Sequence, residues 1–322
     1  MTLKTVSLVI PFFNEGQGVA PFFQRLMQTC HKLKSRYAFQ MVCINDGSTD
    51  ATLDELVKAR QTLMGLLADD NASEITITII DFSRNFGKEA ALTAGIDHAT
   101  GDAVIPMDAD LQHPPELLPV LLEKWEEGYE VVLAQRTSRH TDHFAQKFAA
   151  RLFYKLHQKI SQIHMPADVG DFRLMDRRVV DAVKQLRENN RFMKGIFAWV
   201  GFKSVLVSFE VEARSTGHSS FNVWKLWNLA LDGITSFSTV PLRVWTYLGG
   251  LVSLTAFLYA SYIFVRTLVY GVDTPGYASL MIAILFLGGV QLIGIGVLGE
   301  YLGRVYSEVK ARPPYIIRQI IS

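Results

Sequence analysis

The chain has 322 residues, which leaves room for one large domain and an appendage. A formal net charge of +1 argues against a general nucleic-acid binder, which needs a basic excess, so no nucleic-acid partner is expected. The two cysteines, Cys30 and Cys43, stand at no metal-binding spacing and indicate no disulfide framework, which fits a reducing cytosolic location for the soluble part.

The first half of the chain alternates short β-rich runs with longer helical patterns. This alternation predicts an α/β domain in which helices cover a parallel sheet. The expected strands are Val6–Ile10, Met41–Ile44, Ile75–Ile80, Ala103–Met107 and Glu130–Ala134. The expected helices are Gly18–Tyr37, Thr52–Leu67, Gly87–His98 and Glu116–Glu127. Polar runs follow several of these strands, and ligands of open α/β sheets bind at that edge, so we expect one site there.

Two carboxylates one residue apart, Asp108 and Asp110, follow the fourth expected strand, with Ala109 between them. Hard oxygen ligands at this spacing suit one divalent cation that keeps open positions for substrate phosphates. Such a cation would neutralise the charge of a diphosphate leaving group. An isolated Asp-x-Asp pair is commonly a solvated turn, but its continuation as Leu-Gln-His-Pro-Pro-Glu is less common by chance. Gln112 is a further candidate oxygen ligand, and His113 is expected to be structural.

Two more polar loops follow predicted strands. The run Asn45–Asp50 is interpreted either as a capped turn or as a nucleotide contact in which Asp46 accepts hydrogen bonds from a base or ribose. The run Ser83–Glu89 is a third loop at the same edge, where Lys88 either faces phosphate or pairs with Glu89 or solvent.

No charged residue occurs from Val244 to Val265 or from Thr274 to Gly299. Each run is long enough for a membrane span, which needs about 20 residues; a buried soluble hairpin is the alternative. Aromatic residues flank the first run, and Phe221–Phe237 is interpreted as an amphipathic helix lying along the interface. Basic residues lie before the first run and after the second, so the positive-inside rule predicts that both termini are cytoplasmic.

Glycines 289, 296 and 303 recur at heptad spacing in and after the second apolar run. They predict close helix packing, either within the hairpin or between subunits of a homo-oligomer. Residues 143–160 form a basic, aromatic-rich helical stretch, for which a packed surface helix and a membrane-surface contact are equally favoured.

Four runs occur in the order typical of glycosyltransferase family 2: Ile10–Glu15, Asn45–Ser48, Ser83–Lys88 and Asp108–Gln112. Three later runs narrow the match: Gly170–Leu174, Phe192–Gly195 and Leu298–Arg304. Over nearly its whole length the chain resembles the bactoprenol (polyprenyl-phosphate) glucosyltransferases of that family, relatives of the dolichyl-phosphate mannose synthases. The resemblance implies a GT-A (Rossmann-like) fold, a nucleotide-sugar donor, a polyprenyl phosphate acceptor, a place in the bacterial inner membrane and a role in O-antigen or cell-surface glucosylation.

The resemblance also implies roles for single residues. The implied nucleotide-sugar site comprises Pro11, Phe13, Glu15, Asp46, Lys88, Asp108, Ala109, Arg136 and Arg139. Asp108, Asp110 and Gln112 are implied to hold Mg²⁺ or Mn²⁺. Arg136, Arg139 and Arg214 are implied to bind phosphates of donor or acceptor, against the alternative of salt-bridged surface arginines. Where the family usually has Arg-x-x-Gly-x-Ser-Lys, this chain has Ser220 in place of the lysine, so one cationic phosphate contact is missing. His218 is a candidate for partial compensation.

A lipid phosphate is ionised near neutral pH, because its second pKa is about 6, so it needs a general base less than a sugar hydroxyl does. We therefore expect in-line displacement at the anomeric carbon, with inversion and a metal-held UDP leaving group. The predicted catalytic residues are Asp110, Asp171 and Arg214. Asp171 is expected to orient the acceptor or act as base, with a structural cap as the alternative. The preference for UDP-glucose rests on whole-chain similarity alone.

The predicted organisation is a GT-A domain at 1–220, an interfacial amphipathic region at 221–243, two transmembrane helices within 244–302 (about 244–265 and 276–299) and a cytoplasmic basic tail at 303–322. A processive polysaccharide synthase is disfavoured because the Gln-x-x-Arg-Trp motif is absent, and a catalytically silent membrane scaffold because the acidic ligands are intact. The main alternative is the same reaction with GDP-mannose, a UDP-N-acetylhexosamine or UDP-amino-arabinose, because sugar choice depends on pocket shape.

Overall fold

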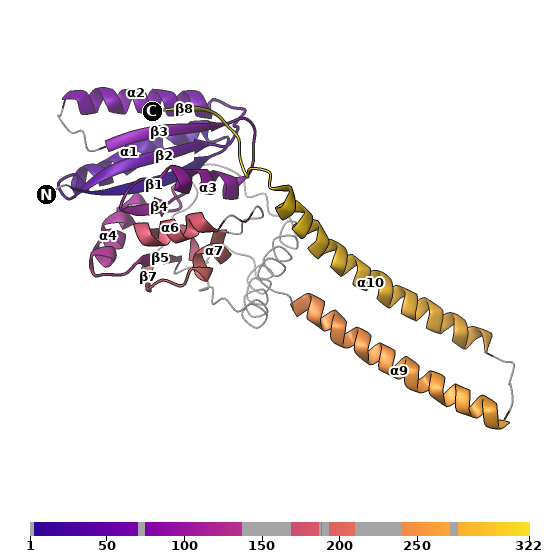
Figure 1. The fold of residues 1–322 in the computed structure, drawn as a ribbon. Coiled ribbons are helices and arrows are strands. Elements are labelled where there is room, and N and C mark those ends of the chain that lie inside the picture. Colours follow the sequence, from indigo (N-terminus) through magenta and orange to yellow (C-terminus); the bar gives the residue numbers. More distant parts are fainter. Residues whose placement is uncertain are drawn as a thin grey trace.

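An eight-stranded mixed sheet forms the centre of the N-terminal part of the protein in the computed structural model (Figure 1). The structure describes residues 3–69, 75–136, 169–186, 188, 193–209, 240–270 and 276–322. Its strands, in the spatial order β7-β5-β6-β4-β1-β2-β3-β8, are β1 (Lys4–Phe12), β2 (Tyr37–Asn45), β3 (Ile75–Phe82), β4 (Ala103–Pro106), β5 (Val131–Arg136), β6 (Val169–Asp176), β7 (Ser204–Phe209) and β8 (Ile317–Ile321). The helices are α1 (Gly16–Leu33), α2 (Thr52–Asp69), α3 (Lys88–His98), the short 3₁₀ helix η1 (Pro115–Leu117), α4 (Leu118–Glu126), α6 (Arg177–Gln185), α7 (Met193–Trp199), α9 (Val240–Tyr270) and α10 (Tyr277–Lys310).

Helices cover both faces of the sheet, because successive side chains of a strand point to opposite faces. Leu8 and Ile10 of β1 are buried on the face covered by α1, α2 and α4, whereas Val9 is buried on the face of α3, α6 and α7. Gly95 lets α3 approach β1 closely, since an added Cβ would lie 2.1 Å from Val9 Cγ1. Burial on both faces explains why β1 and β2 appear in the sequence as near-continuous apolar runs.

The five predicted strands and four predicted helices all form, with boundaries shifted by a few residues. The expectation of a parallel sheet holds for these five strands, which all run in one direction, but the complete sheet is mixed. The strands β1 to β4 are parallel, but β6 runs antiparallel to β4 and β5, and β8 runs antiparallel to β3. The strands β6, β7 and β8 were not predicted, because they lie outside the regular alternation of strand and helix on which the prediction rested.

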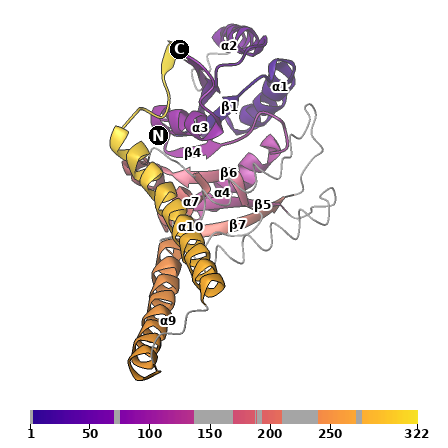
Figure 2. The ribbon, with the colours of Figure 1, turned by 90° about the vertical axis from the view of Figure 1, so that its right-hand side faces the viewer.

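The helices α9 and α10 project from the sheet domain side by side (Figures 1 and 2). Tyr247–Tyr270 and Phe286–Lys310 are long and apolar enough to cross a membrane, and neither is buried within the protein. With 34 residues at about 1.5 Å each, α10 is about 51 Å long, against about 30 Å for the hydrocarbon core of a bilayer. The second helix therefore continues past residue 299, where the predicted span ends, and its charged end extends beyond the apolar run.

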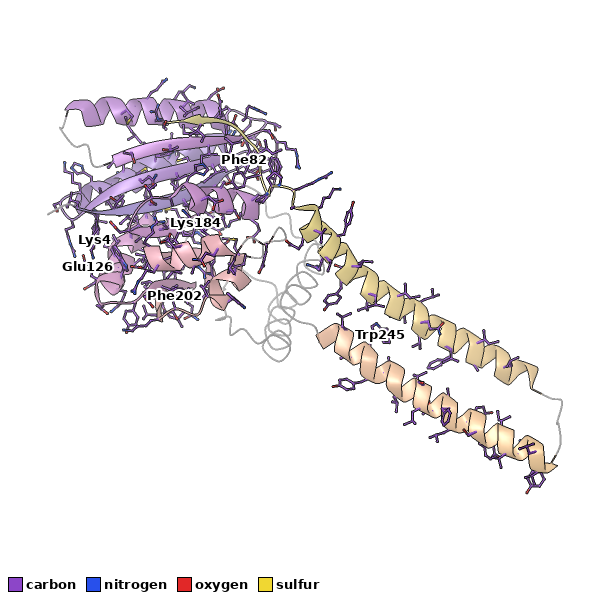
Figure 3. All side chains as sticks on the ribbon, in the orientation of Figure 1. Lys4, Phe82, Glu126, Lys184, Phe202 and Trp245 are labelled. Atoms are coloured by element: carbon purple, nitrogen blue, oxygen red, sulfur yellow. The ribbon has the colours of Figure 1, made fainter. Side chains whose placement is uncertain are left out.

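Contact within this hairpin involves Trp245 of α9, which lies between the two helices in Figure 3. A Cβ added at Gly294 would lie 3.9 Å from Trp245 Cε2. A Cβ added at Gly289, Gly296 or Gly303 would meet no atom of the described residues within 4 Å. Packing among the described residues therefore does not account for these three glycines, and packing between subunits stays a prediction.

Candidate active site

The carboxyl ends of β1, β2, β3 and β4 meet at one edge of the sheet, because these four strands are parallel. The loops that leave them carry the polar runs singled out in the sequence. Because β6 runs antiparallel to β4, its first residues lie at the same edge. Asp171, near the start of β6, is thereby brought to the loop that follows β4.

Hydrogen bonds join the first two loops at this edge. Asn14, whose backbone φ is 53°, accepts a bond at Oδ1 from the Thr49 amide (2.9 Å), and its own amide donates to Ser48 Oγ (3.0 Å). The Gly16 amide donates to Asp50 Oδ2 (3.1 Å). A structural turn, one of the two interpretations of the run Asn45–Asp50, is thus formed by Ser48, Thr49 and Asp50.

Asp46 is buried and holds the third loop. Its carboxylate accepts bonds from the Phe86 amide (2.7 Å), the Gly87 amide (3.0 Å) and Asn85 Nδ2 (3.1 Å). Burial raises the pKa of Asp46 above its ordinary value, while the amides of Phe86 and Gly87 and the charge of Arg84 oppose that rise. Asp46 therefore fixes the backbone just before α3, and its contact with a base or ribose stays a prediction.

Gly47 allows the second and third loops to touch. It has a left-handed φ of 61°, and an added Cβ would lie 2.2 Å from the carbonyl carbon of Arg84. Gly47→Ala is expected to displace the third loop and lower the transfer rate by about 10²-fold, the cost of misplacing active-site groups by about 1 Å. The rate is measured beside Gly128→Ala, which also places an alanine at a positive φ (91°) but leaves its Cβ with no atom within 4 Å. Equal losses in the two variants would contradict the steric explanation.

Asp108 and Asp110 lie on a tight turn after β4. Leu111 in this turn has a left-handed φ of 60°, which costs a bulky residue about 1–2 kcal/mol. His113 is buried, stacks on Phe172 with ring centroids 4.9 Å apart, and accepts a bond at Nδ1 from the Asp108 amide (3.3 Å). His113 thus occupies the structural position expected of it and anchors the main chain of the first carboxylate.

Lys88, the first residue of α3, joins two carboxylates from separate loops. Its Nζ lies 2.6 Å from Asp108 Oδ1 and 3.0 Å from Asp171 Oδ2. Burial alone would lower the pKa of Lys88, but the charges of Asp108 and Asp171 outweigh it and raise the pKa above its ordinary value. The ammonium therefore stays charged at neutral pH and lies within reach of both groups.

A buried arginine to which no role was assigned from the sequence, Arg173, lies behind Asp171 on the same face of β6. Arg173 is 4% exposed, donates from Nη2 to the Gly170 carbonyl (2.6 Å) and lies 4.4 Å from the ring centroid of Phe197. Burial lowers the pKa of Arg173 to about 10, and the charge of Asp171 opposes this shift. Asp171 therefore lies among cationic groups. Arg173 could have been recognised in the sequence, because it is a charged residue within a strand pattern that is otherwise largely apolar.

The other predicted site residues lie along the same edge or outside the described residues. Phe13 follows β1 and is 48% exposed, a position from which an aromatic ring can stack on a planar ligand. Pro11 and Glu15 are half-buried on either side of it. Arg136 ends β5, and only its main chain is described. Outside the described residues lie Arg139, Arg214, His218, Ser220, the stretch 143–160 and the predicted interfacial helix Phe221–Phe237.

The donor set after β4 fits a divalent cation such as Mg²⁺ or Mn²⁺. Asp108 and Asp110 supply carboxylate oxygens, and the backbone amide of Gln112 donates to Asp110 Oδ1 (3.1 Å). The role of the Gln112 side chain as a ligand stays a prediction. In the described ranges, no three His, Cys, Asp or Glu residues gather into a metal cluster. A cation here would therefore complete its shell with water and substrate phosphates, as Mg²⁺ usually does.

The sheet domain and the C-terminal hairpin each match a known protein family. Residues 7–184 match Glycosyl transferase family 2, and residues 240–305 match the GtrB C-terminal hairpin. An uncharacterised glycosyltransferase of Synechocystis sp. is 53% identical over 320 residues, 99% of this chain and 96% of that protein. The SfII prophage-derived bactoprenol glucosyl transferase of Shigella flexneri is 52% identical over 314 residues, 98% of this chain and 97% of that protein. The structure of glucosyl-3-phosphoglycerate synthase from Mycobacterium tuberculosis is similar with a TM-score of 0.45 and 17% identity, over 72% of this chain and 78% of that one.

Proposed function

Since the chain belongs to glycosyltransferase family 2, we propose that it transfers glucose from UDP-glucose to polyprenyl phosphate at the cytoplasmic face of the bacterial inner membrane. The relatives named bactoprenol glucosyl transferase, which match along nearly the whole chain, support the lipid acceptor and the sugar. The observation that carries the proposal is the meeting of Asp108 and Asp171 at the Lys88 ammonium. In this proposal Asp108 acts on the donor diphosphate through a cation, and Asp171 acts on the acceptor.

In the proposed reaction a phosphate oxygen of the lipid attacks the anomeric carbon while the bond from that carbon to the diphosphate breaks, with inversion. A divalent cation held by Asp108 and Asp110 would neutralise charge on the leaving diphosphate. Asp171 orients the acceptor phosphate through the cations around it, and Lys88 keeps its positive charge beside the developing negative charge. The acceptor phosphate is already ionised near neutral pH, so no proton has to leave it before attack.

The membrane hairpin suits this pair of substrates. A polyprenyl phosphate keeps its head group at the membrane surface, whereas a nucleotide sugar is dissolved in the aqueous phase. The helices α9 and α10 would anchor the sheet domain at that surface, and the apolar stretches Tyr247–Tyr270 and Phe286–Lys310 support this arrangement. An enzyme held there encounters both substrates without extracting the lipid.

The test is incubation of the purified full chain with polyprenyl phosphate, Mg²⁺ and one labelled nucleotide sugar at a time. Label recovered in organic solvent is then measured. We expect metal-dependent transfer from UDP-glucose and a product of inverted anomeric configuration. Retained configuration would overturn the single displacement.

The alternative donors are GDP-mannose, UDP-N-acetylhexosamine and UDP-amino-arabinose. Their case rests on the dependence of sugar choice on pocket shape, which membership of the family does not fix. Transfer from one of them in place of UDP-glucose would leave the reaction type intact and replace the sugar. No lipid-linked product from any donor would support the membrane scaffold instead.

A further inference from the structure

After α10 the chain returns to the sheet domain and ends as its edge strand. β8 pairs antiparallel with β3, with Ile320 opposite Ile80 and Gln319 opposite Asp81, and Figure 1 shows the C-terminus beside β3. Residues 303–322 were predicted to form a cytoplasmic basic tail, whereas they form the end of α10, a short link and this strand. The match to the hairpin family ends at residue 305, so the strand lies outside both family matches.

The segment around β8 contacts the residues that lead into the third loop of the site. The Ser83 amide donates to the Ile316 carbonyl (3.0 Å), and Arg318 Nη2 donates to the Ser83 carbonyl (2.9 Å). Tyr315 stacks on Phe82 with ring centroids 5.3 Å apart and planes 9° apart. Figure 3 shows Phe82 at this edge, where the chain returns from α10. Ser83 is therefore bonded through both its amide and its carbonyl to the C-terminal segment.

A buried carboxylate extends this contact to the second loop. Asp81 of β3 is fully buried and accepts a bond from Asn45 Nδ2 (2.8 Å), and Arg318 Nη1 lies 3.5 Å from its Oδ2. A buried carboxylate needs such partners, because an unpaired buried charge is strongly destabilising. Asn45 immediately precedes Asp46, which fixes the amides of Phe86 and Gly87. The loop that ends at Lys88 is thus held by Asp46 on one side and by the C-terminal segment on the other.

We propose that Arg318 and Tyr315 are positioning residues for the nucleotide-sugar site, acting through Ser83 and Asp81 on the loop from Ser83 to Lys88. The inference rests on the proposed function in one respect: it assigns this loop to the donor. The C-terminal strand then connects α10 of the hairpin to the loop proposed to bind the donor. Tyr315 adds a second attachment, because its hydroxyl donates to Asp97 Oδ2 of α3 (2.9 Å), the helix that begins with Lys88.

The test compares Arg318→Ala with Arg312→Ala in the full chain in lipid nanodiscs. Both variants remove one positive charge from the same C-terminal segment, but Arg312 lies in the link before the strand. Amide hydrogen exchange is measured for residues 83–87, and KM is measured separately for UDP-glucose and for polyprenyl phosphate. For Arg318→Ala we expect faster exchange in residues 83–87 and a donor KM raised about five- to tenfold, the order of losing a charge-assisted hydrogen bond. The lipid KM should stay within about twofold, Arg312→Ala should match the wild type, and Arg318→Lys should recover part of the loss.

A rise in the lipid KM alone, or an equal effect of Arg312→Ala, would overturn the proposal in favour of a charge that serves the membrane. Unchanged exchange in residues 83–87 with an unchanged donor KM would overturn it as well. If Arg318→Ala unfolds, Tyr315→Phe replaces it, since this variant removes only the hydroxyl bond to Asp97. If the wild type transfers no sugar, the proposed function fails. The present inference is then still tested by amide hydrogen exchange in residues 83–87 and by the affinity of each variant for UDP.

Discussion

Asp110→Ala is expected to lower kcat/KM for the nucleotide sugar by about 10²–10³-fold, the cost typical of losing a group that stabilises charge in the transition state. Asp108 and Asp110 are the carboxylates expected to hold a cation after β4, and among the described residues they belong to no larger metal-binding cluster, so Asp108 alone should hold the cation more weakly. The measurement is the initial rate of label transfer to polyprenyl phosphate at several concentrations of Mg²⁺. More Mg²⁺ should restore the activity only in part.

Asp54→Ala is the matched control, because it removes one exposed carboxylate from the first turn of α2 and leaves the site untouched. Its kcat/KM should equal that of the wild type. Binding of Mn²⁺ in the presence of UDP, followed by electron paramagnetic resonance, provides a readout other than turnover. Wild-type Mn²⁺ affinity in Asp110→Ala would show that this carboxylate is not a ligand, even if activity falls.

Lys88→Gln and Asp171→Asn are each expected to lower kcat by about 10²-fold or more at saturating substrates. Lys88→Gln removes the charge that lies between Asp108 and Asp171, whereas Asp171→Asn keeps the shape of the Asp171 side chain and removes its charge. Because these side chains are in contact, their effects should not add. The double variant should be only slightly slower than the slower single variant in a single-turnover measurement of sugar transfer.

Lys58→Gln is the control for this pair. Its ammonium lies 2.7 Å from Glu55 on the exposed surface of α2, so the substitution also breaks a lysine–carboxylate ion pair. No change in kcat is expected, because exposed pairs of this kind contribute little. Fully additive losses at Lys88 and Asp171 would mean that the two residues act independently. A near-normal kcat for Asp171→Asn would remove the role proposed for that carboxylate.

The sequence was sufficient for features that depend on neighbouring residues. Asp108 and Asp110 were recognised because their spacing and the strand that precedes them can be seen within a short stretch of sequence. The loops at the strand ends were recognised because the ends of parallel strands lie at one edge of a sheet. The two apolar helices followed from runs without charge. Asp46 shows the limit of such reasoning. Its residue type suited a nucleotide contact, but its bonds to Phe86 and Gly87 depend on how two loops pack.

The α/β class, the loops that carry the motifs and the hairpin of two long apolar helices could be predicted from the amino-acid sequence, because periodicity, spacing and charge-free length are properties of short stretches. Which of these groups come into contact depends on how distant segments pack together. The antiparallel direction of β6 brings Asp171 to Lys88, and the pairing of β8 with β3 brings Arg318 to Asp81, 237 positions away. Strand direction and register between distant segments are set by packing of the whole sheet, so no local pattern specifies them.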